Sequence, residues 1–253
     1  GGALSLLLVF RTNSAYNRFW EARCIWESLQ NRCRDLARFV YVYRAQVTPA
    51  RALRVAQLLA AFPPALRRHL CGAGSPLPQL APLPPLDAAV AAAMRASPSR
   101  PLYVCKRLAA ELAAVPDGGG FSSRERLVGM GRVDQLSSYV GACERLLQTP
   151  VPLNYARHTS RFLTLWCLTL PMSLVGSMGA ISIPVTAFVT WCLFSIQEIG
   201  LFIEHCSLDD GAIFMDQIAD DVALDIFEAV AEDEAPLEGD GGHSIGRKES
   251  VCK

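Results

Sequence analysis

The chain has 253 residues, no net formal charge, and a hydrophobic share of 51%. Intrinsic disorder over most of the chain is excluded, because disordered chains are poor in apolar residues. The length allows one or two domains. No useful strand-like alternation occurs in the sequence, which predicts an all-α fold.

The zero net charge hides two halves of opposite sign. Residues 1–161 hold 21 Lys+Arg and 9 Asp+Glu, whereas residues 162–253 hold 3 and 15. We expect the two halves to pack together or to line different surfaces. Arg supplies 21 of the 24 basic residues, which argues against a loose Lys-rich tail that binds nucleic acid. We expect no nucleic-acid partner.

The first ten residues form an apolar run that stops at Arg11 and begins without Met. We expect a truncated amino terminus, with residues 1–10 forming the end of a membrane helix. The pattern from Tyr16 to Tyr43 is helical, and the stretch 11–44 carries seven Arg. Such a helix would leave the membrane and enter a soluble helical layer, which we place at residues 11–160.

The middle of the chain alternates helices with loops that contain Pro and Gly. Asp87 is expected near the start of one helix, which Pro98 and Pro101 break, and Ser122 or Ser123 is expected to cap another. We expect helices at 50–70, 87–96, 102–115 and 123–148, an irregular loop at 71–86 and a second loop at 116–123.

The strongest physical signal is a run of 36 residues without charge, Phe162–Gln197. One membrane helix needs about 20 apolar residues, so this run is long enough for two. Gly176, Gly179 and Pro184 divide it, which predicts a transmembrane hairpin within 161–203. The alternative is a buried hairpin in the core of a large soluble protein.

Residues 204–231 are expected to form an acidic amphipathic region. Apolar residues recur at helical spacing from Ile213 to Val230, and acidic residues lie between them. Residues 232–253 are acidic and Gly-rich, which predicts a disordered tail. A protein partner could bind this tail.

Motifs for catalysis and metal binding are absent from the sequence. The nine Cys show no C-x-x-C spacing, and we expect reduced thiols. The His205–Cys206 pair and the acids from Asp209 to Asp221 lack the spacing of zinc or EF-hand sites. We therefore expect no enzyme activity, no catalytic residue, no metal site and no cofactor.

Two segments go beyond a generic membrane protein. They are LSLLLVFRTNSAYNRFWEARCIWESLQNRCRDLAR, which starts at Leu4, and GACERLLQTPVPLNYARHTSRFLTLWCLTLPMSL, which starts at Gly141. Both resemble the bestrophin family of pentameric anion channels, closest to its plant and algal branch of thylakoid chloride channels. The resemblance implies a multi-pass helical membrane protein, a homo-pentameric ring in contact with membrane lipid, and a location in the chloroplast thylakoid membrane.

The resemblance also places site residues. The family's pore neck consists of apolar side chains at i, i+4 and i+8, which fall at Gly2, Leu6 and Phe10; Leu6 and Phe10 fit the pattern. Fivefold symmetry would turn each into an apolar ring that gates by dewetting. Their alternative role is packing against neighbouring helices.

Four polar residues follow the predicted neck: Arg11, Asn13, Ser14 and Asn17. We expect some of them to face an anion vestibule, with a salt bridge or backbone contact as the alternative for Arg11. An ungapped alignment puts the family's inner aperture near Arg124. Arg18, Glu21 and Arg23 are expected to form ion pairs between helices.

The leading hypothesis is a passive channel for chloride, bicarbonate or both. Its rival is a non-conducting membrane scaffold that binds a partner through the Arg-rich layer or the acidic tail. The dense acidic calcium clasp of the animal members is not evident, which makes calcium gating doubtful.

Overall fold

A computed structural model describes residues 2–71, 86–149, 153–206 and 215–231. Within them one isolated bridge, Gly118 to Phe121, is the only β-pairing, so the all-α prediction is confirmed. The elements are α1 (Gly2–Val42), α2 (Pro49–Cys71), α3 (Ala88–Ala96), α4 (Arg100–Ala113), α5 (Ser123–Gln148), α6 (Leu153–Met178), the 3₁₀ turn η1 (Gly179–Ile181), α7 (Ser182–Cys206) and α8 (Met215–Ala231).

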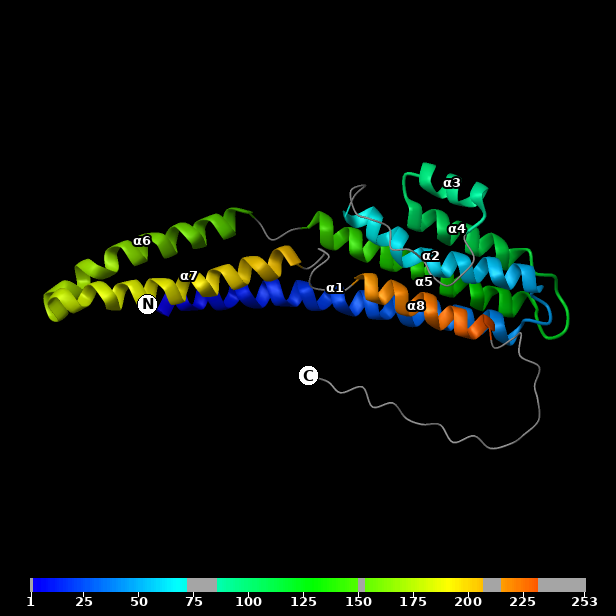
Figure 1. Cartoon of the computed structure of the whole chain (residues 1–253), viewed down its shortest axis with the longest axis horizontal. Coiled ribbons are helices and arrows are strands. Elements are labelled where there is room, and N and C mark those ends of the chain that lie inside the picture. The colour runs from blue at the N-terminus through cyan, green and yellow to red at the C-terminus, as the bar shows by residue number, and fades with distance from the viewer. Residues whose placement is uncertain (1, 72–85, 150–152, 207–214, 232–253) are drawn as a thin grey trace, which may run out of the picture.

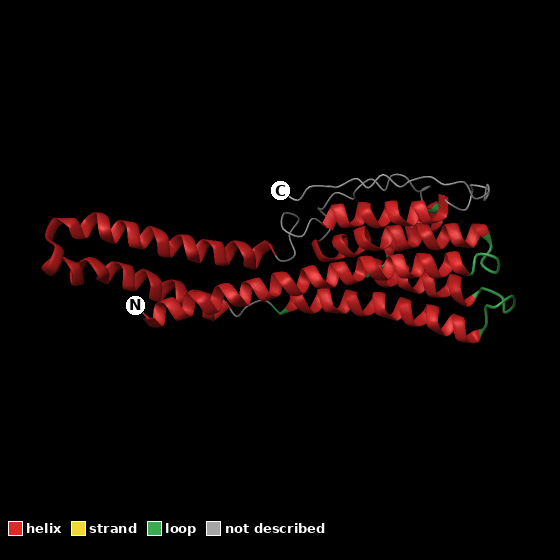
Figure 2. Cartoon of the chain, turned by 90° about the horizontal axis from the view of Figure 1, so that it is seen from below, coloured by secondary structure: helices red, strands yellow, loops and turns green. Residues whose placement is uncertain are grey.

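The molecule is elongated and has two parts (Figure 1). Helices α6 and α7 form an antiparallel hairpin, which with the first third of α1 makes a narrow structure that we call the apolar arm. Helices α2, α5 and α8 pack on the rest of α1, and α4 packs on α2 and α5; these helices run side by side and form the bundle (Figure 2), with α3 outside against α4 (Figure 1). Helix α1 is thus the element that joins the two parts.

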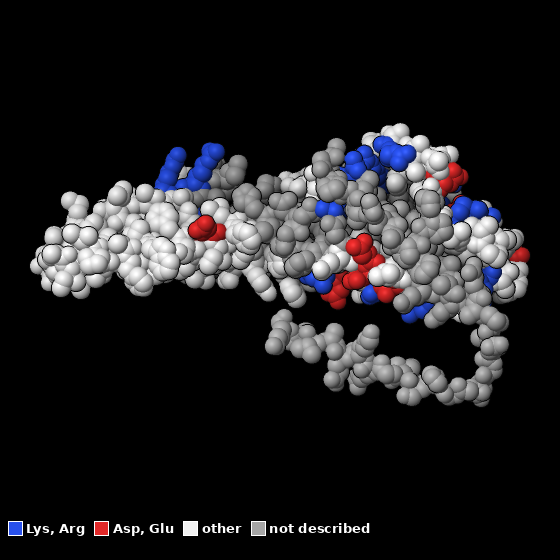
Figure 3. Space-filling model, viewed as in Figure 1, with Lys and Arg blue, Asp and Glu red and all other residues white. Residues whose placement is uncertain are grey.

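The apolar arm exposes side chains that a water-soluble domain would bury. Met172, Ile183 and Phe202 are 79%, 71% and 68% exposed, and Figure 3 shows an arm surface with few charged groups. Among the described residues one stretch, Arg157–Ile203, is long and apolar enough to cross a membrane, with a mean hydropathy of 1.8. The hairpin is therefore not a buried core of this chain, and its surface suits a lipid or protein environment.

The bundle core forms because α1 presents apolar residues at spacings of three and four. Trp26, Leu29, Cys33 and Leu36 are fully buried on one face of α1, against residues of α2, α4, α5 and α8. Helix α1 has no break between the two parts, so it runs directly from the apolar arm into the bundle.

Ion pairs join helices of the bundle, and one of them joins the basic and acidic halves of the sequence. Nε of Arg34 in α1 lies 2.6 Å from a carboxylate oxygen of Asp225 in α8. Glu111 in α4 is 9% exposed, and Arg54 of α2 donates to both of its carboxylate oxygens at 3.2 Å. A carboxylate buried in this way is tolerated because it is paired.

Two helices begin at side-chain caps. Asp87, expected within the start of its helix, is the N-cap of α3 and accepts a hydrogen bond from the Ala89 backbone N–H at 3.1 Å. Ser122 and Glu125 form a capping box at the start of α5. The hydrogen bond from the Ser122 hydroxyl lowers the pKa of Glu125. The preceding loop turns at Gly118, Gly119 and Gly120, which all have positive φ.

Some predicted details are wrong. Pro101 does not break a helix: it lies in the first turn of α4, where its missing N–H costs nothing. Helix α6 begins at Leu153, eight residues before the expected Arg161, because no breaker follows Pro152. Most of the expected loop at 71–86 and all of the expected tail at 232–253 lie outside the described residues.

Candidate functional site

One face of α1 within and just beyond the apolar arm is open. Leu6 and Phe10 are each 56% exposed, whereas Leu4 and Leu8 are 3% exposed. Leu4 and Leu8 form a small apolar core with Leu163 and Cys167 of α6. Because α1 buries this face against the hairpin, Leu6 and Phe10 project away from it. Neither is packed into the interior of its own chain.

The open face continues with uncharged polar residues. Asn13, Ser14 and Asn17 are exposed, one to two turns beyond Phe10. The Ser14 hydroxyl donates to the Phe10 carbonyl oxygen at 2.9 Å, so its proton is already engaged. No hydrogen bond joins the side chains of Asn13 and Asn17 to any described residue. Their amide N–H groups are therefore available to an anion.

Arg11 differs from this group. It is 3% exposed and lies on the face of α1 that carries Leu8 and Ala15, about 100° around the helix from Phe10. Arg11 therefore lies on a different face of α1 from the exposed residues Asn13 and Asn17. The alternative, a contact within the chain, agrees with its burial.

Contacts beyond the arm hold α1 in register with α5. Arg18 donates to the carbonyl oxygens of Leu146 at 2.7 Å and of Thr149, at the carboxyl end of α5. A cation at this end offsets the partial negative charge of the helix terminus. Glu21 pairs with Arg145 of α5. The ion pair expected for Glu21 is confirmed, whereas Arg18 acts as a cap rather than an ion-pair partner.

Arg23 shows a further difference from the expectation. Its side chain is half-buried, and no ion pair joins it to a residue in the described ranges. The prediction of an interhelical ion pair is therefore not met at this position.

Arg124 lies far from the neck residues. It is exposed in the first turn of α5, next to Phe121, whose ring packs edge-on against Tyr43 at a centroid distance of 5.4 Å. Phe10 and Phe39 are 29 positions apart in α1, roughly 44 Å along the helix, and Phe39 also contacts Phe121. The structure places Arg124 at the membrane-distal end of the bundle, and its role as an inner aperture stays a prediction.

The described residues contain no group of three side chains suited to a metal ion. The seven cysteines whose side chains are described are free thiols. Burial raises the pKa of Cys33 and of Cys105, and raises that of Cys143 to about 12, so these thiols stay protonated and unreactive. His205 and Cys206 have no described side-chain placement.

Proteins of known family are similar to this chain in sequence and in fold. A voltage-dependent anion channel-forming protein of Synechocystis is 31% identical over 213 residues, which cover 80% of this chain and 66% of that protein. The chloroplastic voltage-dependent chloride channel 1 of Arabidopsis thaliana is 31% identical over 230 residues, or 90% of this chain and 54% of the relative. The chain thus spans less than two thirds of the length of these relatives.

Solved structures share the fold. A bacterial bestrophin homologue from Klebsiella pneumoniae superimposes with a TM-score of 0.79 over 93% of this chain and 86% of the other, at 24% identity. The family described as "Bacterial/Fungal Bestrophin protein" matches residues 1–228. The chain therefore belongs to the bestrophin family.

Proposed function

We propose that the protein is a passive anion channel, with the open face of α1 lining its pore. The observation that carries the proposal is the pairing on one helix face of exposed apolar side chains, Leu6 and Phe10, with unengaged amides, Asn13 and Asn17. An apolar ring gates by dewetting, and neutral amide donors attract an anion without trapping it. Relatives named as anion and chloride channels support the same function.

The proposed pore is formed by a homo-oligomer, which we take to be a pentamer. A single α1 helix cannot enclose a pathway, and its open face needs copies of itself around an axis. Exposed apolar residues in the bundle, among them Leu127 at 73% and Leu147 at 48%, supply further surface for contacts between subunits.

The protein is an integral membrane protein, and we propose the chloroplast thylakoid as its membrane. Chloroplastic relatives in Arabidopsis thaliana support this location. We propose chloride or bicarbonate as the permeant ion, with no calcium or other cofactor required. A protein partner at residues 232–253 is also a proposal, and this tail lies outside the described residues.

The test is anion current from the purified full-length protein in a planar bilayer. We expect a current whose reversal potential follows the chloride gradient, and a separate measurement with bicarbonate would rank the two ions. Light scattering in mild detergent would measure subunit number. A stable monomer, or the absence of current at all voltages with and without calcium, would refute the proposal and favour the scaffold.

A further inference from the structure

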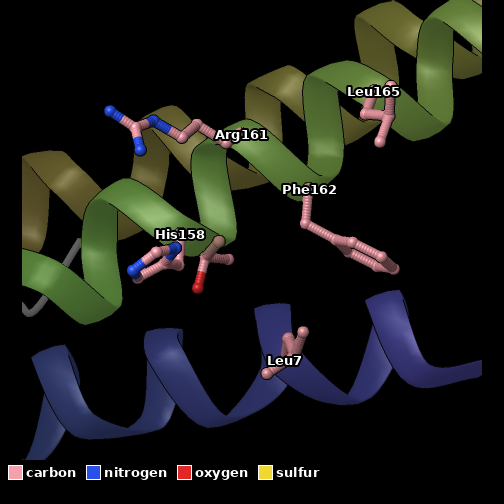
Figure 4. Close-up of a pocket in the computed structure, with 6 residues that line it drawn as sticks. Leu7, His158, Arg161, Phe162 and Leu165 are labelled. Atoms are coloured by element: carbon pink, nitrogen blue, oxygen red, sulfur yellow. The ribbon is translucent and has the colours of Figure 1, made fainter.

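We propose that a groove at the base of the apolar arm holds an anionic phospholipid. The groove lies between α1 and α6 and has a volume of about 450 Å³. Figure 4 shows its lining residues: Leu7 on α1 faces α6, His158 and Phe162 lie on the side of α6 toward α1, and the Arg161 side chain extends from the other side of α6. The lining residues are Leu7, His158, Thr159, Arg161, Phe162 and Leu165.

The two ends of the groove differ in chemistry. His158 and Thr159 lie toward the bundle, whereas Phe162 and Leu165 follow along α6 toward the tip of the arm. Leu165 is roughly 10 Å farther along the helix axis than His158. Phe162 and Leu165 are 43% and 61% exposed. A phospholipid has the same polarity, with its phosphate at the membrane edge and its acyl chains toward the midplane.

The polar end carries uncompensated positive charge. Arg157 and Arg161 are exposed and are separated by one helical turn. No hydrogen bond or ion pair joins either of them to a described residue, and Figure 3 shows basic side chains projecting from the arm. Between Arg157 and Ile203 the sequence has one acidic residue, Glu198. An anionic headgroup therefore meets an attractive field at this point, whereas a neutral headgroup gains less.

The sequence context supports a lipid over a soluble anion. The basic residues directly precede the 36-residue uncharged run, which is where basic residues concentrate at a membrane surface. Apolar side chains that continue from the charged end give an acyl chain a surface to contact, and a soluble anion would use none of it. This inference rests on the placement of the arm in a membrane and not on ion conduction.

The first test measures lipid binding to the full-length protein by native mass spectrometry. The probes are phosphatidylglycerol, which is anionic, and phosphatidylcholine, which is zwitterionic. The variant is Arg157→Gln/Arg161→Gln. The matched control is Arg95→Gln/Lys106→Gln, which removes the same charge from exposed positions in the bundle.

Each basic residue near an anionic lipid surface contributes about a fivefold factor. We therefore expect the apparent affinity for phosphatidylglycerol to fall about 25-fold in the arm variant, and to stay unchanged in the control. Affinity for phosphatidylcholine should change little in either. Equal loss in both variants, or equal binding of the two lipids by the unmodified protein, would overturn the proposal.

The second test identifies what occupies the apolar end. A photoreactive benzoylphenylalanine replaces Phe162 in the full-length protein within vesicles that contain both lipids. We expect the label on phosphatidylglycerol in excess over its share of the membrane. Label on another subunit or on another segment of the same chain would show that protein fills the groove. Neither test reads ion current, so its outcome is independent of the proposed channel function.

Discussion

Two neighbouring residues of α1 allow the pore face to be tested with a matched pair of variants. Leu8 and Phe10 are two positions apart, but Leu8 is 3% exposed and Phe10 is 56% exposed. Leu8 belongs to the apolar core that joins α1 to α6, whereas Phe10 lies on the open face. Alanine at Leu8 should therefore mainly lower stability, and alanine at Phe10 should mainly change conduction.

The stability effects follow from burial. Leu8→Ala leaves a cavity between helices and should cost about 3 kcal/mol. Full burial of a Phe side chain contributes about 1.5–3 kcal/mol. Phe10 is 44% buried, the complement of its 56% exposure, so Phe10→Ala should cost about 1 kcal/mol within the subunit. These values correspond to about 6–12 °C and 2–4 °C in the thermal midpoint.

The conduction effects should have the reverse order. Phe10→Ala removes a phenyl ring from every subunit at the narrowest proposed ring, and we expect about a tenfold larger anion current in a planar bilayer. This corresponds to about 1.4 kcal/mol less barrier. Leu8→Ala should leave the current of folded channels nearly unchanged. The reasoning is refuted if Phe10→Ala lowers the thermal midpoint as much as Leu8→Ala and leaves the current unaltered.

Three other variants or conditions probe the remaining features. Asn17→Asp should lower the anion-to-cation permeability ratio about tenfold, because five carboxylates at roughly 10 Å from the pore axis each repel an anion by about 0.4 kcal/mol in water before screening. Asn17→Gln is the control, and an unchanged ratio in Asn17→Asp would show that Asn17 does not line the pathway. At pH 8 a thiol reagent should modify exposed Cys71 and not Cys143, whose pKa is raised by burial to about 12; rapid labelling of Cys143 in the native protein would contradict its burial. The free energy of unfolding should also decline as the pH rises from about 9 toward 12, because the Cys143 thiol of the unfolded chain releases its proton at a lower pH than that of the folded chain. Gly129→Val should destabilise the bundle by about 1–3 kcal/mol in thermal unfolding, because a Cβ there would lie 3.1 Å and 3.2 Å from two apolar side chains, whereas Gly131→Val meets open space and is the control; equal midpoints for these two variants would argue against close packing at Gly129.

The local structure of this protein could be predicted from sequence because its causes are local. Apolar spacing in α1 and the capping residue Ser122 define helices through contacts between residues close in the chain. The uncharged run Phe162–Gln197 identifies a membrane hairpin by its length and composition. The expected start of α6 at Arg161 is wrong because it was placed at the edge of the uncharged run, whereas the helix begins directly after Pro152.

The composition of the candidate site required the tertiary structure. Phe10 and Arg11 are adjacent in sequence, and helical geometry places them on different faces, but it does not say which face the hairpin covers. Packing of α6 and α7 on Leu4 and Leu8 buries the side that carries Arg11 and leaves Phe10 open. Likewise, Arg18 caps α5 only because distant segments meet. Periodicity along one chain is a local property, whereas the choice of buried face is made by contacts between residues more than a hundred positions apart.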